Sequence, residues 1–225
     1  MGGYGEYTLA EGRYAAKLPE ALSLDDGALV EPLACGSQAA RLGGVRPDSR
    51  VLVIGAGPIG LAAIYWARQM GCERIAAAAL SDRNRSLAMT MGATSFVRQG
   101  DDFAASVAEE LGGAPDIVFE CAGGIGPIAQ AIDAVRLRGT VIAAGFCLEP
   151  QPIVTAGALT KQIRLQFSLA YTMEDFRRSI AALDGGSLQP RAMLSDTIPL
   201  DALPATMEAL RQDKSRCKVM VDPWG

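Results

Sequence analysis

A glycine-rich segment at residues 55–60 carries the clearest chemical signal in this sequence. It reads G-x-G-x-x-G, directly follows a β-branched run at 51–54 and opens a helical pattern at 61–70. In this setting the first glycine permits a tight turn, the second lets the backbone approach a pyrophosphate, and the third lets the helix lie close to the sheet. The free N–H groups and the dipole at the start of the helix also attract phosphate. The segment therefore predicts a dinucleotide site rather than a merely tight turn, and the candidate contacts are Gly55, Gly57, Pro58, Ile59 and Gly60.

The end of the next predicted strand indicates which dinucleotide is bound. An NAD site needs an acidic residue about 20 residues after the glycine loop, where it holds the ribose hydroxyls. That position is Ala79 or Leu80, and the nearest acid, Asp82, lies beyond the strand end. Arginine binds a 2′-phosphate through charge-assisted hydrogen bonds. The pattern favours NADP, with NAD as the alternative if the arginines only face solvent, and the candidate phosphate ligands are Ser81, Arg83 and Arg85.

Two further loops follow predicted strands at 116–120 and 140–144. Ligands bind at the carboxyl ends of strands in parallel sheets, and small residues there let a ribose and a nicotinamide ring rest against the backbone. Cys121 is interpreted as a small packed residue rather than a nucleophile, because no base accompanies it. The candidate contacts in these loops are Cys121, Ala122, Gly145 and Phe146.

Strands and helices alternate through the middle of the chain. The apolar runs predict strands at 51–54, 74–80, 94–97, 116–120, 140–144 and 163–167, with helices at 61–70, 83–91, 102–111 and 127–135. This rhythm predicts an α/β fold with a doubly wound, six-stranded parallel (Rossmann) sheet.

Both ends of the chain depart from this rhythm. Before it we expect a strand-like run at 7–9, a short helix that starts near Leu24 and is capped by Ser23 and Asp26, and a second helix at 33–42. After it the pattern predicts helices at 173–183 and 203–211 and strands at 193–198 and 217–221.

The composition argues against several classes of function. The chain has 225 residues, 49% hydrophobic and 20% charged, and its net charge of −4 argues against nucleic acid as a partner. It contains no histidine, so no Ser-His-Asp or Cys-His nucleophile system can form within it. Its five cysteines include no C-x-x-C pair, and we expect buried, reduced thiols. No stretch resembles a signal peptide or a membrane span, so we expect a soluble, cytoplasmic protein with no membrane partner.

Further motifs accompany the glycine loop and its proline. They are Glu31-Pro32-Leu33, Gly43-Gly44-Val45, Met91-Gly92-Ala93, Phe119-Glu120-Cys121-Ala122-Gly123 and the ending Lys218-Val219-Met220-Val221-Asp222-Pro223. In combination they resemble the zinc-dependent medium-chain dehydrogenases, especially the sorbitol and threonine dehydrogenase branch. The resemblance covers essentially all of the chain.

This resemblance implies that the chain is mainly the coenzyme-binding part of such an enzyme. Members begin with a GroES-like catalytic domain that holds a catalytic cysteine and a Gly-His-Glu zinc motif, and this segment is missing here. On that basis residues 1–32 are the end of the catalytic domain, 33–170 the dinucleotide-binding domain, and 171–225 a segment that returns to the catalytic domain. The catalytic residues are expected in the missing domain.

Glu31 is the single position that matches a residue near the zinc of this family, where a glutamate ligates the metal or holds its water. Zinc sites in proteins need three or four ligands, so one carboxylate cannot hold the metal. We therefore expect no zinc bound to this chain. A charge near a helix start is an equally good interpretation of Glu31.

The activity implied by the resemblance is hydride transfer between NAD(P) and a small secondary alcohol or carbonyl compound, with zinc polarising the oxygen. The chain alone is expected to be inactive. Two alternatives are a stand-alone dinucleotide-binding module and a zinc-free reductase of the same superfamily.

The strand at 163–167 is expected at the sheet edge. In the family that the chain resembles, the corresponding strands pair across a two-fold axis, so a homodimer or a tetramer is expected.

Overall fold

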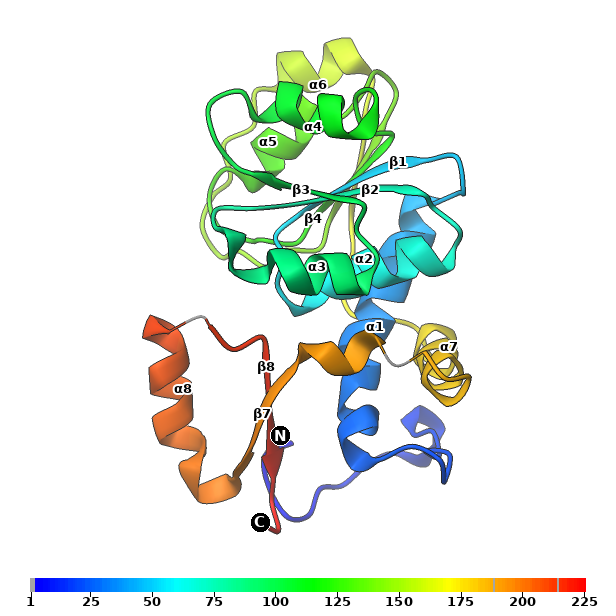
Figure 1. Ribbon diagram of the computed structural model, residues 1–225, viewed down its shortest axis with the longest axis vertical. Helices are drawn as coiled ribbons and strands as arrows, with labels where there is room; N and C mark the ends of the chain where they lie inside the picture. The colour runs from blue at the N-terminus through cyan, green and yellow to red at the C-terminus, as the bar shows by residue number, and fades with distance from the viewer. Residues whose placement is uncertain (1–2, 188, 214) are drawn as a thin grey trace.

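A six-stranded parallel sheet forms the centre of the molecule (Figure 1). The computed structural model describes residues 3–187, 189–213 and 215–225. The strand order is β3-β2-β1-β4-β5-β6, which confirms the expected doubly wound α/β fold. The strands are β1 (Arg50–Ile54), β2 (Arg74–Ala79), β3 (Ser95–Arg98), β4 (Ile117–Glu120), β5 (Thr140–Ala143) and β6 (Arg164–Phe167).

Helices cover both faces of this sheet, as Figure 1 shows. Along β1, Val51 and Val53 belong to one apolar core, and Leu52 and Ile54 belong to the other. This alternation follows from the two-residue period of a strand and explains why β1 is apolar throughout. The first core is covered by α1 (Leu24–Gly43), α2 (Pro58–Gln69) and α3 (Arg85–Met91), and the second by α4 (Phe103–Leu111), α5 (Pro127–Ala134) and α6 (Thr155–Lys161).

A smaller part of the chain lies below the sheet in Figure 1, and the long helix α1 extends into it. Here β7 and β8 pair in a separate two-stranded parallel sheet. The elements of this part are α7 (Met173–Asp184), β7 (Leu194–Pro199), α8 (Leu203–Gln212) and β8 (Lys218–Asp222). Short 3-10 turns lie at η1 (Gly12–Tyr14), η2 (Asp82–Asn84), η3 (Gln189–Met193) and η4 (Leu200–Ala202).

The expectation of two helices before β1 is wrong, because α1 is continuous through Pro32. Proline has no N–H to donate to the carbonyl four residues earlier, which normally interrupts a helix. Tertiary contacts outweigh this loss: Leu33 is fully buried, and the indole Nε1 of Trp66 donates to its carbonyl at 2.7 Å. The expected cap is confirmed, since Ser23 and Asp26 form a reciprocal capping box.

Other elements also differ from expectation. The segment 7–9 is not a strand, and it is largely exposed with no neighbouring strand to pair with. Helix α2 starts at Pro58, three residues earlier than expected, because proline suits the first helical turn. Helix α6 was not expected, since no side chain caps its start. Of the five cysteines, all free, only Cys72 is buried.

Two buried carboxylates, each 1% exposed, hold α1 to the smaller part. Asp175 of α7 accepts hydrogen bonds from Ser37 at 2.9 Å and from Arg41 at 3.3 Å, both on α1. Asp26 of α1 accepts two hydrogen bonds from Arg191 of η3, at 2.6 and 2.8 Å. The Arg191 guanidinium lowers the pKa of Asp26 to about 2. These contacts fix α7 and η3 on the helix that also supports the sheet.

No helix among the described residues is long and apolar enough to cross a membrane.

Helices α1 and α2 pack at a point where only a glycine fits. A Cβ on Gly36 would lie 2.5 Å from the backbone carbon of Ala62 and 2.8 Å from its carbonyl oxygen. Both atoms belong to a buried helix, so the backbone itself would have to move.

We predict that Gly36→Ala lowers the free energy of unfolding by about 1–2 kcal/mol, because overpacking outweighs the gain in helix propensity. Urea denaturation followed by circular dichroism measures this. The matched control is Gly157→Ala in α6, where a Cβ meets nothing within 4 Å and stability should stay equal or rise. A Gly36→Ala variant as stable as this control would contradict the assigned contact.

Candidate functional site

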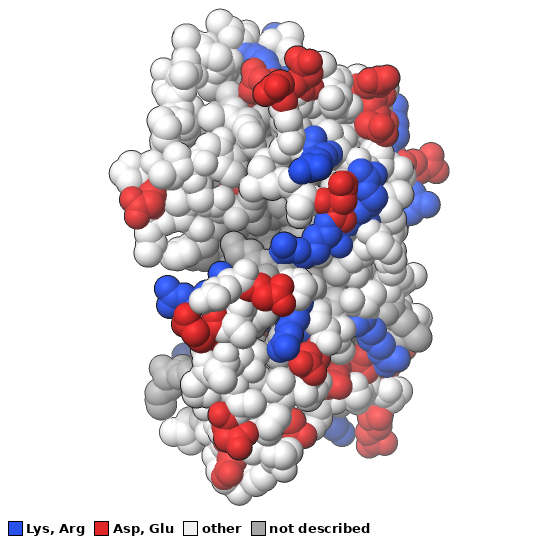
Figure 2. All heavy atoms as spheres, turned by 60° about the vertical axis from the view of Figure 1, so that its left-hand side comes forward, with Lys and Arg blue, Asp and Glu red and all other residues white. Residues whose placement is uncertain are grey.

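The candidate site lies at the carboxyl ends of β1, β4 and β5. The order of strands reverses between β1 and β4, and ligands of doubly wound sheets bind at this switch point. The N–H of Gly55 bonds to the carbonyl of Ala78, and that of Cys121 to the carbonyl of Ile54, each at 2.8 Å. The first residues of the loops after β1 and β4 thus continue the hydrogen bonding of the sheet before the loops diverge. Figure 2 shows a hollow between the two parts of the molecule, with Lys and Arg side chains gathered beside it.

The three glycines of the loop have different surroundings. Gly55 has φ +101°, and a Cβ there would lie 2.6 Å from the backbone nitrogen of Ala122. A Cβ on Gly60 would lie 1.8 Å from the carbonyl oxygen of Gly55. Gly57 differs from both, because it has extended backbone and its Cβ would meet nothing within 4 Å. The fold therefore requires Gly55 and Gly60, whereas Gly57 leaves space on the open side of the loop.

The start of α2 presents unpaired amide groups beside this space. Gly57 is the N-cap residue and forms no side-chain cap, and Pro58, next in the chain, has no N–H. The N–H groups of Ile59 and Gly60 have no acceptor within the helix, since they belong to its first turn. This arrangement is suited to an anionic group such as a phosphate.

Asn84 was not singled out from the sequence, yet it holds the glycine loop in place. Its side-chain Nδ2 donates to the carbonyl of Ala56 at 2.7 Å. The bond joins the turn η2 after β2 to the loop after β1. No spacing rule could have found this contact, because it depends on how the two loops meet in space.

Ser81, Arg83 and Arg85 lie together around η2 and are all exposed. Arg85 is engaged within the chain: it pairs with Asp82 at 2.8 Å, and its guanidinium lies 4.8 Å from the ring centroid of Phe96. No hydrogen bond or ion pair is recorded for Arg83 within the described residues. Arg83 is thus the cation most available to a ligand, and Arg85 neutralises the one acid of the turn.

The loops after β4 and β5 contact each other closely. A Cβ on Gly123 would lie 2.5 Å from the carbonyl oxygen of Phe146, and a Cβ on Gly145 would lie 2.4 Å from the nitrogen of Gly123. The Phe146 side chain is 77% exposed, and Ala122 is exposed too. Burial raises the pKa of the Cys121 thiol, and the charge of Glu120 raises it further, so this cysteine is not an activated nucleophile.

Glu31 lies on the exposed side of α1 and is not part of a metal site within the described residues. Its Oε1 accepts a hydrogen bond from Cys35 Sγ at 3.4 Å. Burial, followed by the charge of Glu31, raises the pKa of Cys35 to about 12, which disfavours the thiolate that binds zinc. No group of three or more His, Cys, Asp or Glu that could hold a metal occurs in the described part of the chain. These residues therefore do not fit a zinc ion.

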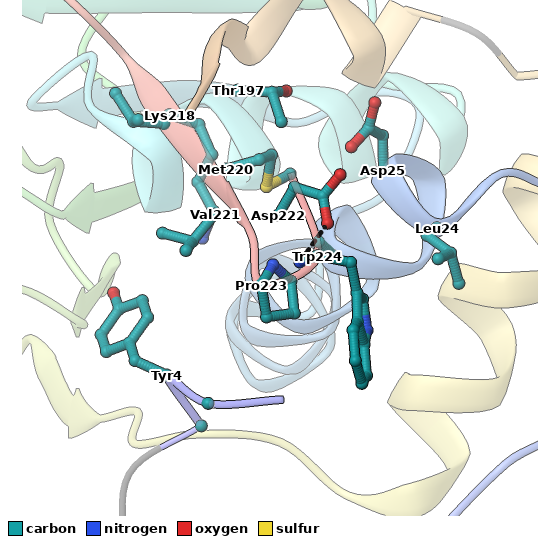
Figure 3. Close-up of a pocket in the computed structure, with 14 residues that line it drawn as sticks. Tyr4, Leu24, Asp25, Thr197, Lys218, Met220, Val221, Asp222, Pro223 and Trp224 are labelled. Carbon is teal, nitrogen blue, oxygen red and sulfur yellow. Dashed lines mark hydrogen bonds between the residues drawn. The ribbon is translucent and has the colours of Figure 1, made fainter. Parts of the chain in front are cut away.

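A separate pocket of about 480 Å³ lies in the smaller part of the molecule (Figure 3). Lys218, Met220 and Trp224 from β8 and the end of the chain line it together with Tyr4 near the start. No residue of the glycine loop contributes to this pocket.

The strand order and the position of the glycine loop define an α/β protein with the Rossmann fold. Comparison with known families is in agreement, because a profile described as "Zinc-binding dehydrogenase" matches residues 58–185. The chain belongs to this family, as the sequence motifs indicated.

Similar proteins include enzymes named for polyols and related sugars. The chain is 32% identical over 193 residues to a protein of Rhizobium meliloti described as a D-xylulose reductase, covering 84% of this chain and 55% of that protein. It is 28% identical over 214 residues to sorbitol dehydrogenase of Bos taurus, covering 92% of this chain and 59% of that enzyme. The chain thus spans little more than half the length of these relatives.

A solved structure from Sinorhizobium meliloti 1021, described as a zinc-binding dehydrogenase bound to NADP, superposes with a TM-score of 0.89. It is 28% identical in sequence, and the match covers 99% of this chain and 66% of that one.

Proposed function

We propose that this chain binds a nicotinamide dinucleotide across the loops after β1, β4 and β5. The observation that carries the proposal is Gly57, a glycine that the fold does not need and that leaves open space beside the free amides of α2. The pyrophosphate would lie there, on the N–H groups of Ile59 and Gly60. The ribose and the nicotinamide ring would rest on Cys121, Ala122, Gly145 and Phe146.

We propose further that the chain is the coenzyme-binding part of an alcohol or polyol dehydrogenase. When bound, the coenzyme supplies or accepts a hydride at a secondary alcohol or carbonyl carbon. The residues of this chain bind and orient it. The names of the relatives support this class of substrate. Catalysis and zinc binding are proposed to depend on residues other than those described, because no suitable donor set occurs among them.

The two ends of the chain are proposed to complete a second domain. Residues near both ends of the chain, among them Tyr4, Lys218 and Trp224, line the pocket of Figure 3. Aromatic side chains in these end segments are exposed, with Tyr4 at 65%, Tyr7 at 83% and Trp224 at 63%. A folded domain packed against them would bury this apolar surface. A cytoplasmic location is proposed as well, since all five cysteines are free.

Dinucleotide binding is tested most directly at Gly57. We predict that Gly57→Val abolishes NADP and NAD binding in calorimetry, because the added methyl groups occupy the proposed pyrophosphate position. The melting temperature should change little, since the Cβ meets no protein atom within 4 Å. Gly157→Val, the same change at another open glycine, should bind as the unmodified chain does. Absence of binding by the unmodified chain would overturn the proposal.

NADP is proposed as the preferred coenzyme, supported by Arg83 and by the lack of an acid at the end of β2. We predict that Arg83→Ala weakens NADP binding about tenfold or more and leaves NAD binding within about twofold, because an arginine–phosphate contact is lost. Arg85→Ala should have a smaller effect, since Asp82 already pairs with it. Adding Arg85→Ala to Arg83→Ala should erase the preference.

Calorimetric titration of the variants with both coenzymes measures these differences. The control is Arg178→Ala on α7, a partly exposed arginine that pairs with Glu174. Equal affinity of the unmodified chain for NADP and NAD would contradict the assignment.

A homodimer through β6, with a tetramer as an extension, is proposed from the open edge of the sheet. Strand β6 pairs with β5 alone, and apolar side chains near it are exposed, with Phe167 at 65% and Leu169 at 82%. The N–H groups of Arg164 and Ser168 bond to carbonyls on the β5 side. By the alternation of a strand, the N–H of Leu165 points to the free edge, where a second copy could pair.

We predict that Leu165→Pro gives a folded monomer, because it removes an edge donor and no hydrogen bond to β5. Light scattering behind a sizing column at tens of micromolar measures the mass, and circular dichroism confirms folding. A monomeric unmodified chain would refute the dimer. A dimeric Leu165→Pro variant would exclude this edge as the interface.

A further inference from the structure

A buried carboxylate lies in the wall of the site and has no role in the binding described above. Glu120 is the last residue of β4 and is 1% exposed. Its Oε1 accepts hydrogen bonds from the N–H groups of Ala122 and Gly123, each at 2.8 Å. Its backbone carbonyl accepts two more, from Ala144 and Gly145, also at 2.8 Å. One residue thus organises the loops after β4 and β5.

The carboxylate lies directly behind the backbone of Gly145. A Cβ at Gly145 would lie 2.6 Å from each carboxylate oxygen of Glu120. No side chain therefore separates the carboxylate from the peptide groups of this loop. A ligand resting on the backbone of Gly145 would therefore lie near this carboxylate.

Among the described residues, no cation pairs with Glu120. The ion pairs recorded among the described residues do not include it. Its recorded side-chain partners are the two backbone amides, whose dipoles satisfy its oxygen but carry no net charge. The negative charge of Glu120 also acts on the loop after β4, where it contributes to raising the pKa of the adjacent Cys121. A negative charge on a buried carboxylate interacts more strongly with a nearby positive charge than an exposed carboxylate does, because less water screens it.

We propose that Glu120 biases this site toward the oxidised form of a bound nicotinamide coenzyme. The inference rests on the proposed function, which places the nicotinamide ring on the loops after β4 and β5. The oxidised ring carries a positive charge and the reduced ring is neutral. The fixed charge behind Gly145 therefore stabilises the oxidised form selectively, and Glu120 is a specificity-determining residue for the redox state of the coenzyme.

The test compares the affinities for NADP⁺ and NADPH in the unmodified chain and in Glu120→Gln, measured by calorimetry. Glutamine keeps an oxygen for the two amides and removes the charge. NADP⁺ binding should weaken about three- to tenfold, with NADPH binding changed less than about twofold. Glu110→Gln, the same change on the exposed face of α4, should leave both affinities unchanged.

Glu120→Asp separates charge from shape and covers the case in which Glu120→Gln does not fold. The shorter side chain keeps the charge, so the ratio of the two affinities should stay within about twofold of the original even if both fall. A ratio changed beyond this in Glu120→Asp, or equal losses for both coenzymes in Glu120→Gln, would overturn the inference. Normal binding of both coenzymes by the unmodified chain, with an unchanged ratio in Glu120→Gln, would overturn it while leaving the proposed function intact. Binding of neither coenzyme by the unmodified chain would overturn both.

Discussion

At the carboxyl edge of the sheet, backbone segments approach one another more closely than any residue with a Cβ permits. A methyl group at Gly60 would collide with the carbonyl of Gly55, one at Gly55 with the nitrogen of Ala122, and one at Gly145 with the nitrogen of Gly123. The first contact closes the loop after β1 on itself, and the other two join neighbouring loops, so the loops after β1, β4 and β5 pack against one another through peptide groups. Beside Gly57 this surface is open, and an anionic group can lie there on the amides themselves.

A second close backbone contact, between helices α1 and α2, supports this surface. Helix α1 touches α2 at Gly36 and Ala62 without an intervening side chain, and α2 is the helix whose first turn faces the glycine loop. The same helix α1 carries Asp26 and is bound to α7 through Asp175. The position of α7 and η3 is therefore set in part through a helix that is itself packed against α2. A displacement at the α1–α2 contact would move both.

Much of this architecture could be predicted from the sequence because its signals are local. Apolar or alternating runs predict the six strands, and glycine-containing turns follow β1, β4 and β5. The position of Gly57 between a strand and a helix predicts its open surroundings. The continuity of α1 could not be predicted, since Pro32 is locally unfavourable and only burial against α2 compensates for it. The contributions of Asn84 and Glu120 could not be predicted either. Their side chains are ordinary in type, and their importance arises from the carbonyl and amide groups that the fold brings to them.

The charged side chains around the proposed site are opposite in sign to the groups of the proposed ligand that would lie next to them. Arg83 lies exposed after β2, where a 2′-phosphate would add negative charge, and Arg85 cancels the repulsion that Asp82 would otherwise exert there. Glu120 ends β4, beside the loops on which an oxidised, positively charged ring would rest. The two charges act on different parts of one ligand and belong to different strands, so their contributions to binding should be nearly independent. On this assignment, two selections are separate properties of a single sheet edge. One is the choice between NADP and NAD, which depends on Arg83. The other is the choice between oxidised and reduced coenzyme, which a change at Arg83 leaves unaltered.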